Sequence, residues 1–245
     1  MDSVHYKIIL IYKGSAFGGF QYQENARTVQ GAFEASLRKL GWQGSHILAA
    51  GRTDAGVHAS GQVVSFHLDW QHGEDDLQNA LNHYLPKDMA VIAVHIAPEN
   101  FHPRYDAKSR HYRYRVYCQP QRDPLRDEFA WQVWPEPDCQ PMNEAASLLV
   151  GVHDFAAFGS PTSAGGATVR EVFSAQWQEN GDEYQFDIQA NAYLYHMVRR
   201  ITFLLVNIGQ KRLLVEMLTK SLESGELISN GLAPAQGLVL QNVIY

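Results

Sequence analysis

A short turn in the first half of the sequence carries the side chains with the clearest chemical potential. The stretch HILAAGRTDAGVHASGQVVSF, residues 46–66, contains one acidic residue, Asp54, placed between two glycines. Arg52 lies just before Asp54 and can hold its carboxylate ionised and aimed through a bidentate pair. A carboxylate fixed in this way can act as a nucleophile. The alternative is that Asp54 only caps a turn, as aspartate commonly does.

His58 is a second candidate on the same turn. Together with Asp54 it could serve a metal-dependent hydrolase, which is one hypothesis for this site. Metal sites normally need three or more ligands, and this turn supplies two. A histidine that packs inside the protein or lies on its surface fits the pattern better.

A segment in the middle of the chain alternates arginine with tyrosine. In SRHYRYRVY the two-residue period of a strand places Arg110, Tyr112 and Tyr114 on one face and Arg113 on the other. Tyrosines that stack on bases and arginines that contact phosphates are typical of an RNA-binding sheet surface. A half-exposed strand with solvated arginines has the same composition.

A third group of polar side chains falls in the apolar stretch NAYLYHMVRRI. On a helix, His196, Arg199 and Arg200 would be neighbours at spacings of three and four residues. A buried apolar helix carries such a cluster where it meets a partner or an anion; alternatively, the side chains extend to the surface. The glycines near the N-terminus form neither GxGxxG nor a Walker motif, and no Ser–His–Asp elbow is present.

The elements that must position these side chains are short strands and helices. The strand patterns fall at 5–12, 46–50, 61–68, 89–97, 110–117, 130–134, 170–178, 183–191 and 237–245. The helix patterns fall at 28–41, 74–86, 142–151, 193–209 and 211–225. Thr28 can cap the first helix, and Leu77, Leu81 and Tyr84 should face inward on the second. Residues 159–168 predict a flexible loop.

Hairpin-length links between neighbouring strands favour the α+β class, with mainly antiparallel sheets and helices on the outer face. A polar stretch with two prolines at 98–109 predicts the domain join. We therefore expect two similar halves, an N-terminal one at 1–105 with Asp54 and a C-terminal one at 106–245. No repeat is visible residue by residue.

Composition limits the class of protein. The chain has 245 residues, 45% hydrophobic and 19% charged, as in ordinary globular proteins. No apolar run reaches the roughly 18 residues of a membrane span, and the start MDSVHYKIIL is unlike a signal peptide. We expect a soluble, cytoplasmic protein without a membrane partner.

Cys118 and Cys139 lie in no CxxC pattern, which predicts reduced thiols rather than a cysteine-based zinc site.

Charge is distributed unevenly. The net charge of −6 argues mildly against a nucleic-acid partner. Basic residues nevertheless concentrate in 104–117 and 196–212, while acidic residues concentrate elsewhere. This distribution indicates a basic groove on an acidic body.

Several blocks together resemble the TruA family of tRNA pseudouridine synthases. AGRTDAGVHASGQVVSF resembles the family's active-site signature over its whole length, and FHPRYDAKSRHYRYRVY is similar to its central strand. ANAYLYHMVRRITFLLVNIG and APAQGLVL resemble its C-terminal blocks, and TVQGAFEASL its first helix. The resemblance covers essentially the entire chain. Lys13, Phe20 and Gln236 depart from the usual aspartate, tryptophan and histidine, which bears on substrate detail more than on the reaction.

The resemblance implies an isomerase that converts uridine to pseudouridine at positions 38, 39 and/or 40 of the tRNA anticodon stem-loop. It implies a homodimer whose two α+β halves join around a central basic cleft, without metal or organic cofactor. The C-terminal half would complete that cleft and carry the dimer surface. A catalytically silent RNA-binding protein is the alternative hypothesis.

The resemblance also implies roles for individual residues. Asp54 falls on the family's catalytic aspartate, Arg52 on its arginine partner, and Tyr112 on the tyrosine that lies against the target base. Arg199 falls on a C-terminal active-site arginine. We expect the substrate to be contacted by Tyr112, Arg199, Arg110, Arg113 and His58.

Overall fold

The computed structural model describes residues 3–161, 165–227 and 229–245. The chain forms two compact units: unit 1 is Met1–Lys108 with Leu240–Tyr245, and unit 2 is Ser109–Val239. The division predicted at 105/106 assigned the C-terminal strand to the second half, whereas the structure groups most of it with unit 1. The roles assigned to the two halves remain predictions.

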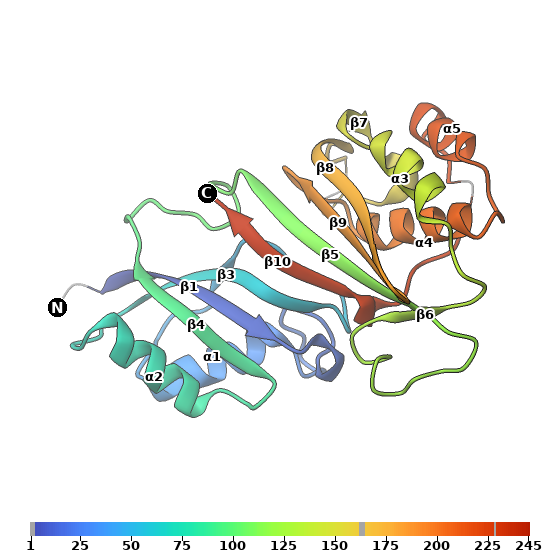
Figure 1. Ribbon diagram of the computed structural model, residues 1–245. Coiled ribbons are helices and arrows are strands. Elements are labelled where there is room, and N and C mark those ends of the chain that lie inside the picture. The colour runs from blue at the N-terminus through green and yellow to red at the C-terminus, as the bar shows by residue number, and fades with distance from the viewer. Residues whose placement is uncertain (1–2, 162–164, 228) are drawn as a thin grey trace. The chain divides into compact units, whose positions relative to one another are not determined.

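Unit 1 contains an antiparallel sheet covered by two helices. Its strand order is β4-β1-β3-β10, and β2 pairs with β3. Helices α1 and α2 lie against the same face of this sheet (Figure 1). The elements of this unit are β1 (Val4–Tyr12), the 3-10 turn η1 (Gly14–Ala16), α1 (Val29–Lys39), β2 (Leu48–Ala49), β3 (His58–Leu68), α2 (Glu74–Tyr84), β4 (Met89–Ile96) and β10 (Leu238–Ile244).

The local signals for these elements are largely confirmed. The Thr28 hydroxyl accepts a hydrogen bond from the Gly31 N–H at 3.2 Å, as expected of a helix cap. Leu77 and Leu81 are fully buried. The prediction that Tyr84 faces inward is wrong, because its side chain is 38% exposed. Tyr84 ends α2, and the Lys39 ammonium lies over its ring, 5.1 Å from the centroid.

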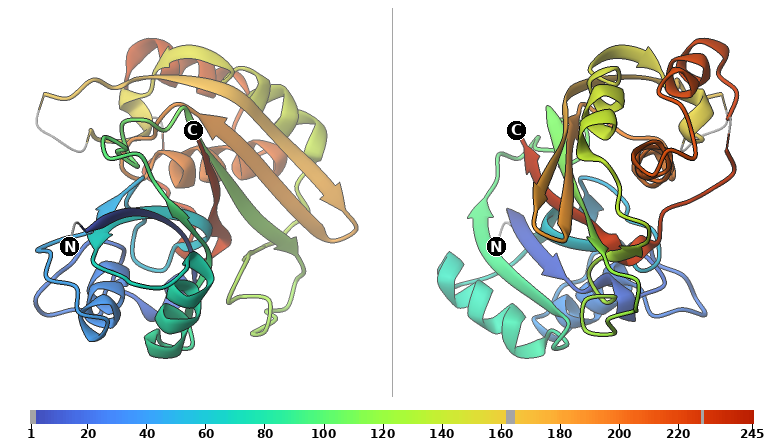
Figure 2. Two further views of the ribbon diagram at one scale, coloured as in Figure 1. Left: turned by 90° about the vertical axis from the view of Figure 1, so that its left-hand side faces the viewer. Right: turned by 45° about the vertical axis from the view of Figure 1, so that its right-hand side comes forward.

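The sheet strands of unit 2 lie in the order β5-β9-β8-β7. Its neighbouring strands are antiparallel, except that β6 pairs parallel to β5. Strands β8 and β9 form a long hairpin (Figure 2). The elements are β5 (Ser109–Cys118), β6 (Trp131–Val133), α3 (Cys139–Ser147), β7 (Gly151–Asp154), η2 (Ala156–Phe158), β8 (Val169–Asn180), β9 (Glu183–Ala190), α4 (Met197–Gly209), α5 (Glu216–Ser224) and η3 (Ala235–Gly237). The mixed class with mainly antiparallel sheet is confirmed.

Several elements of unit 2 differ from the sequence-based predictions, and α5 begins at Glu216 rather than at residue 211. The short strand β7 was not predicted, and α3 begins earlier than expected because Asp138 caps it. The helix expected from residue 193 begins only at Met197, since His196 has a left-handed φ of 68°. Residues 162–164 of the loop expected at 159–168 lie outside the described residues. Within the described chain, no helix has the length and apolar character needed to cross a membrane.

Candidate active site

Asp54 lies in a tight turn that leads into β3. The Val57 N–H donates to the Asp54 carbonyl at 3.1 Å and closes the turn. Gly56 has a φ of 83°, a left-handed conformation that favours glycine. The Asp54 side chain is half-buried. The turn therefore fixes the backbone from which the only carboxylate of the segment projects.

Buried side chains and a neighbouring loop form hydrogen bonds with the residues that precede Asp54 in this turn. The Tyr12 hydroxyl and Thr53 Oγ1 are hydrogen bonded at 2.8 Å, and the Phe20 N–H donates to the Thr53 carbonyl at 3.0 Å. The Gln62 amide donates to the Gly51 carbonyl at 3.0 Å. Burial raises the pKa of Tyr12 to about 12, despite its hydrogen bonds to Thr53 and Gln62, so the phenol stays neutral. The backbone is thus anchored on the N-terminal side of Asp54.

His58 anchors the other side of the turn. Its Nδ1 accepts a hydrogen bond from the Gly14 N–H at 3.0 Å, and the side chain is only 3% exposed. A Cβ on Gly14 would lie 2.0 Å from the Val57 carbonyl oxygen, so this close approach requires glycine. The ring of His58 is thus enclosed and supports the turn. Its contact with the substrate stays a prediction.

The same geometry bears on the hydrolase hypothesis. One ring nitrogen of His58 is already occupied by a backbone N–H. Among the described residues, no group of three or more His, Cys, Asp or Glu side chains is arranged to hold a metal ion. Arg52 is exposed on the turn, and its bidentate pair with Asp54 remains a prediction.

Unit 2 holds the candidate base-contacting tyrosine. Tyr112 is half-buried on β5, opposite Ile188 on β9. Its ring meets that of Tyr193 edge to face, with centroids 5.0 Å apart and an interplanar angle of 87°. Tyr193 was not singled out from the sequence, although it lies in the apolar block that contains Arg199. The ring of Tyr112 is therefore supported by a second aromatic ring.

Arg110 lies on the same strand but is largely enclosed. Its side chain is 9% exposed, and Nη1 donates to the Asn191 carbonyl at 2.7 Å. The guanidinium joins β5 to the segment that follows β9. Contact of Arg110 with the substrate stays a prediction.

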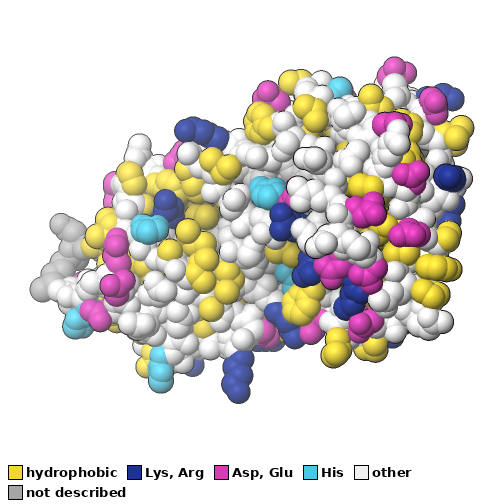
Figure 3. Space-filling view, viewed as in Figure 1, with side chains coloured by type: hydrophobic (Ala, Val, Ile, Leu, Met, Phe, Trp, Pro, Cys, Tyr) yellow, Lys and Arg dark blue, Asp and Glu magenta, His cyan; other side chains and the backbone are white. Residues whose placement is uncertain are grey.

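Arg113 projects from the opposite face of β5. Its Nε and Nη2 donate to the two carboxylate oxygens of Asp187 at 3.0 and 3.1 Å, and His111 Nε2 donates to Oδ1 at 2.7 Å. Burial raises the pKa of Asp187, but these hydrogen bonds outweigh it and leave the pKa below its usual value. Basic and acidic side chains are intermingled where β5, β9 and β8 lie (Figure 3). The Asp187 carboxylate therefore compensates charge on Arg113, and contact of Arg113 with the substrate stays a prediction.

Arg199 holds the segment that precedes β10. Its Nε donates to the Ala233 carbonyl at 2.8 Å, and the Ala233 N–H donates to the Arg199 carbonyl at 3.2 Å. The Tyr114 hydroxyl donates to the neighbouring Pro234 carbonyl at 2.7 Å. Burial raises the pKa of Tyr114 well above its usual value, although the Arg199 charge opposes this. Arg199 and Tyr114 thus bind adjacent carbonyls of one segment.

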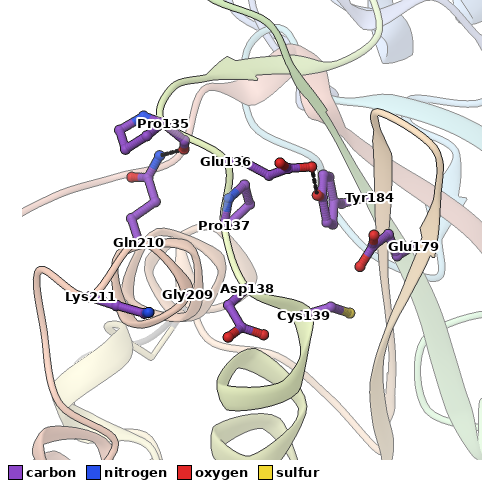
Figure 4. Close-up of a pocket in the computed structure, with 10 residues that line it drawn as sticks. All are labelled: Pro135, Glu136, Pro137, Asp138, Cys139, Glu179, Tyr184, Gly209, Gln210 and Lys211. Carbon is purple, nitrogen blue, oxygen red and sulfur yellow. Dashed lines mark hydrogen bonds between the residues drawn. The ribbon is translucent and has the colours of Figure 1, made fainter.

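A separate cavity of about 550 Å³ lies in unit 2 (Figure 4). The Tyr184 hydroxyl donates to Glu136 there at 3.0 Å. The residues that line it are Pro135, Glu136, Pro137, Asp138, Cys139, Glu179, Tyr184, Gly209, Gln210 and Lys211. None of the predicted site residues lines this cavity, so the candidate chemistry lies elsewhere.

Comparison with known proteins identifies the family. The profile of the tRNA pseudouridine synthases matches residues 8–106 and 145–245. The tRNA pseudouridine synthase A of Citrifermentans bemidjiense is 37% identical, over 98% of this chain and 96% of its own. That of Geotalea uraniireducens is 38% identical, over 98% of each chain. The tRNA pseudouridine synthase A 2 of Bacillus anthracis is 34% identical, over 98% of this chain and 99% of its own. The chain therefore belongs to the tRNA pseudouridine synthase family.

Proposed function

We propose that this enzyme isomerises uridine to pseudouridine at positions 38, 39 and/or 40 of the tRNA anticodon stem-loop, with Asp54 as the catalytic carboxylate. One observation carries the assignment of Asp54. Its turn is anchored on one side by Tyr12 and on the other by His58, as a reacting group requires. The first matched segment of the family profile includes this turn.

The reaction rearranges one nucleotide without any redox step. The N1–C1′ bond breaks, the base turns, and C5 bonds to C1′; C5 loses a proton and N1 gains one. The target base must first leave its stack, which costs a few kcal/mol. Asp54 then attacks C1′ of the ribose or C6 of the base, or assists formation of a glycal.

We assign Tyr112 and Arg199 to the same uridine. Stacking on Tyr112 would offset part of the cost of extruding the base, at roughly 1–3 kcal/mol per base. Tyr112 is also our candidate for removing the C5 proton, directly or through water. Arg52 would pair with the Asp54 carboxylate and fill part of the space left by the extruded base.

The decisive experiment compares wild type with Asp54→Asn in tritium release from tRNA labelled at C5 of uridine. We expect release by the wild type only, with nearly unchanged tRNA affinity in the variant. An Asp54→Asn enzyme with normal activity would refute the assignment. Binding without release in either protein would favour the silent RNA-binding alternative.

Tyr112→Phe separates the two roles of Tyr112. If stacking dominates, turnover survives, because the phenyl ring still lies against the base. If proton removal dominates, turnover collapses although tRNA affinity is kept. Gel-shift titration beside tritium release distinguishes the two outcomes.

We further propose that a cytoplasmic homodimer binds tRNA through a basic groove. The clustering of basic residues at 104–117 and 196–212 supports this. Neutralised phosphates release counterions, so tRNA affinity should fall at least about tenfold between 50 and 200 mM salt. A flat salt dependence would contradict the basic groove, and a monomer in sedimentation with tRNA would contradict the homodimer.

A further inference from the structure

Tyr193 supports Tyr112 from within unit 2. The two rings meet edge to face at 5.0 Å and 87°. This is a preferred arrangement of aromatic pairs, because the positive edge of one ring meets the negative face of the other. A tyrosine ring otherwise has a broad torsional range about its second side-chain bond. The contact therefore restricts the plane in which Tyr112 can lie.

The Tyr193 hydroxyl holds the supporting ring in place. It lies 2.9 Å from the Ile188 carbonyl and 3.2 Å from the Arg110 carbonyl, and its single proton is directed at this pair of acceptors. Ile188 belongs to β9 and Arg110 to β5, so the phenol is attached to both strands next to Tyr112. Burial raises the pKa of Tyr193 well above its usual value, which keeps that proton in place.

The main chain just before Tyr193 is held in place by β5. Arg110 and Ala190 form the end of the β5–β9 ladder, and the chain then leaves the sheet. Directly beyond, the Arg110 guanidinium donates to the Asn191 carbonyl at 2.7 Å. Arg110 thus continues the attachment of the two strands where the main-chain pairing ends.

We propose that Tyr193 is a positioning residue that sets the plane of the Tyr112 ring against the target uracil. The proposal rests on the assignment of Tyr112 made above. An extruded uracil stacks in a reactive position only if the Tyr112 ring already lies in the matching plane, since a misplaced reacting group lowers the rate strongly. Tyr193 acts only through Tyr112, because its own hydroxyl is engaged by main-chain carbonyls.

The first test measures kcat and tRNA Kd for Tyr193→Leu and Tyr193→Phe. Leucine removes the aromatic ring, so kcat should fall about three- to tenfold while Kd stays unchanged. Phenylalanine keeps the ring and should restore most of kcat. Tyr184→Phe is the matched control, because Tyr184 is a buried tyrosine of β9 in the same unit, with its hydroxyl bound to Glu136. Its kcat should equal that of wild type.

A second measurement reads the ring directly. The ring proton NMR signals of Tyr112, assigned by their loss in Tyr112→Phe, should shift in Tyr193→Leu and stay unchanged in Tyr184→Phe. Unshifted signals in a folded Tyr193→Leu protein would overturn the proposal. Equal losses of kcat and affinity in the leucine and phenylalanine variants would also overturn it, since they would indicate general damage to the fold.

Including Asp54→Asn and Tyr112→Leu in the same series separates this inference from the proposed function. If both retain wild-type turnover, the proposed function fails, and the positioning role fails with it. If both are inactive while Tyr193→Leu keeps the wild-type kcat, only the positioning role fails.

Discussion

The Tyr12 hydroxyl lies 2.8 Å from Oγ1 of Thr53, in the interior of unit 1. Thr53 is the residue directly before Asp54 in the chain. Tyr12 is the last residue of β1, and the pairing of β1 with β3 is irregular between Leu10 and Tyr12. Such bulges often re-aim a side chain near a functional site. The position of the Asp54 backbone thus depends on how β1 ends.

The effects of replacing Tyr12 and Thr53 should be coupled, both in the free energy of unfolding and in kcat. Thr53→Val leaves the Tyr12 hydroxyl without this partner and should lower the free energy of unfolding by about 1–3 kcal/mol. Tyr12→Phe should behave similarly, and both should lower kcat because the turn loosens. The double variant should lose less stability than the two single losses combined, since both polar partners are then gone. Denaturant unfolding measures this, and strictly additive losses would contradict the coupling.

His58 should be replaceable by a residue that keeps the acceptor. Asn places its amide oxygen near the position of Nδ1, so His58→Asn should keep the bond from the Gly14 N–H and retain most of kcat. His58→Leu removes the acceptor and should lose about 1–3 kcal/mol of stability together with turnover. Unchanged Kd with lower kcat in the leucine variant would fit a supporting role. A selective loss of tRNA affinity in both variants would instead indicate direct contact with RNA.

Gly14 should tolerate no side chain. Its Cβ would lie 2.0 Å from the Val57 carbonyl oxygen, a backbone atom that cannot move without shifting the turn. Gly14→Ala should therefore destabilise the protein by about 1–3 kcal/mol. Gly51→Ala is the matched control, because a Cβ on Gly51 has nothing within 4 Å. Equal melting temperatures for the two variants would show that the close approach is not required.

The Asp187 cluster should make stability depend on pH. The pKa of Asp187 is lowered, because hydrogen bonds from His111 and Arg113 outweigh the opposing effect of burial. A carboxyl group whose pKa is lowered in the folded state stabilises the protein at pH values above its ordinary pKa of 3.8. This contribution to the free energy of unfolding is lost as the pH falls through the pKa of the folded state. Asp187→Asn should therefore cost about 1 kcal/mol at pH 7 and progressively less below pH 4.

Unfolding curves from pH 7 to pH 3 test the Asp187 prediction. Glu183→Gln is the comparison variant, because Glu183 is more exposed than Asp187, with its carboxylate 3.2 Å from Arg126 and 3.7 Å from Arg115. Exposed pairs contribute little, so this variant should show a smaller dependence on pH. A stability difference for Asp187→Asn that stays constant with pH would exclude the carboxylate as its source.

The sequence by itself determined those features whose signals are local. The strand β5, the cap at Thr28 and the inward-facing Leu77 and Leu81 of α2 each depend on neighbouring residues, and each is confirmed. The contiguous segment around Asp54 and the longer blocks predicted the family, which the comparisons confirm. The prediction failed at Tyr84 and at the start of α4, where a helix end and a left-handed residue override the periodicity.

Only the tertiary structure decided what surrounds the candidate residues. Tyr12 meets Thr53 across 41 positions, His58 meets Gly14 across 44, and Arg113 meets Asp187 across 74. Such partners depend on strand register and on the path of the chain between elements. A residue's type and spacing show what chemistry it can perform. Whether its polar atoms are available or already hydrogen bonded depends on distant segments, because each polar group that is buried must find a partner wherever the fold supplies one.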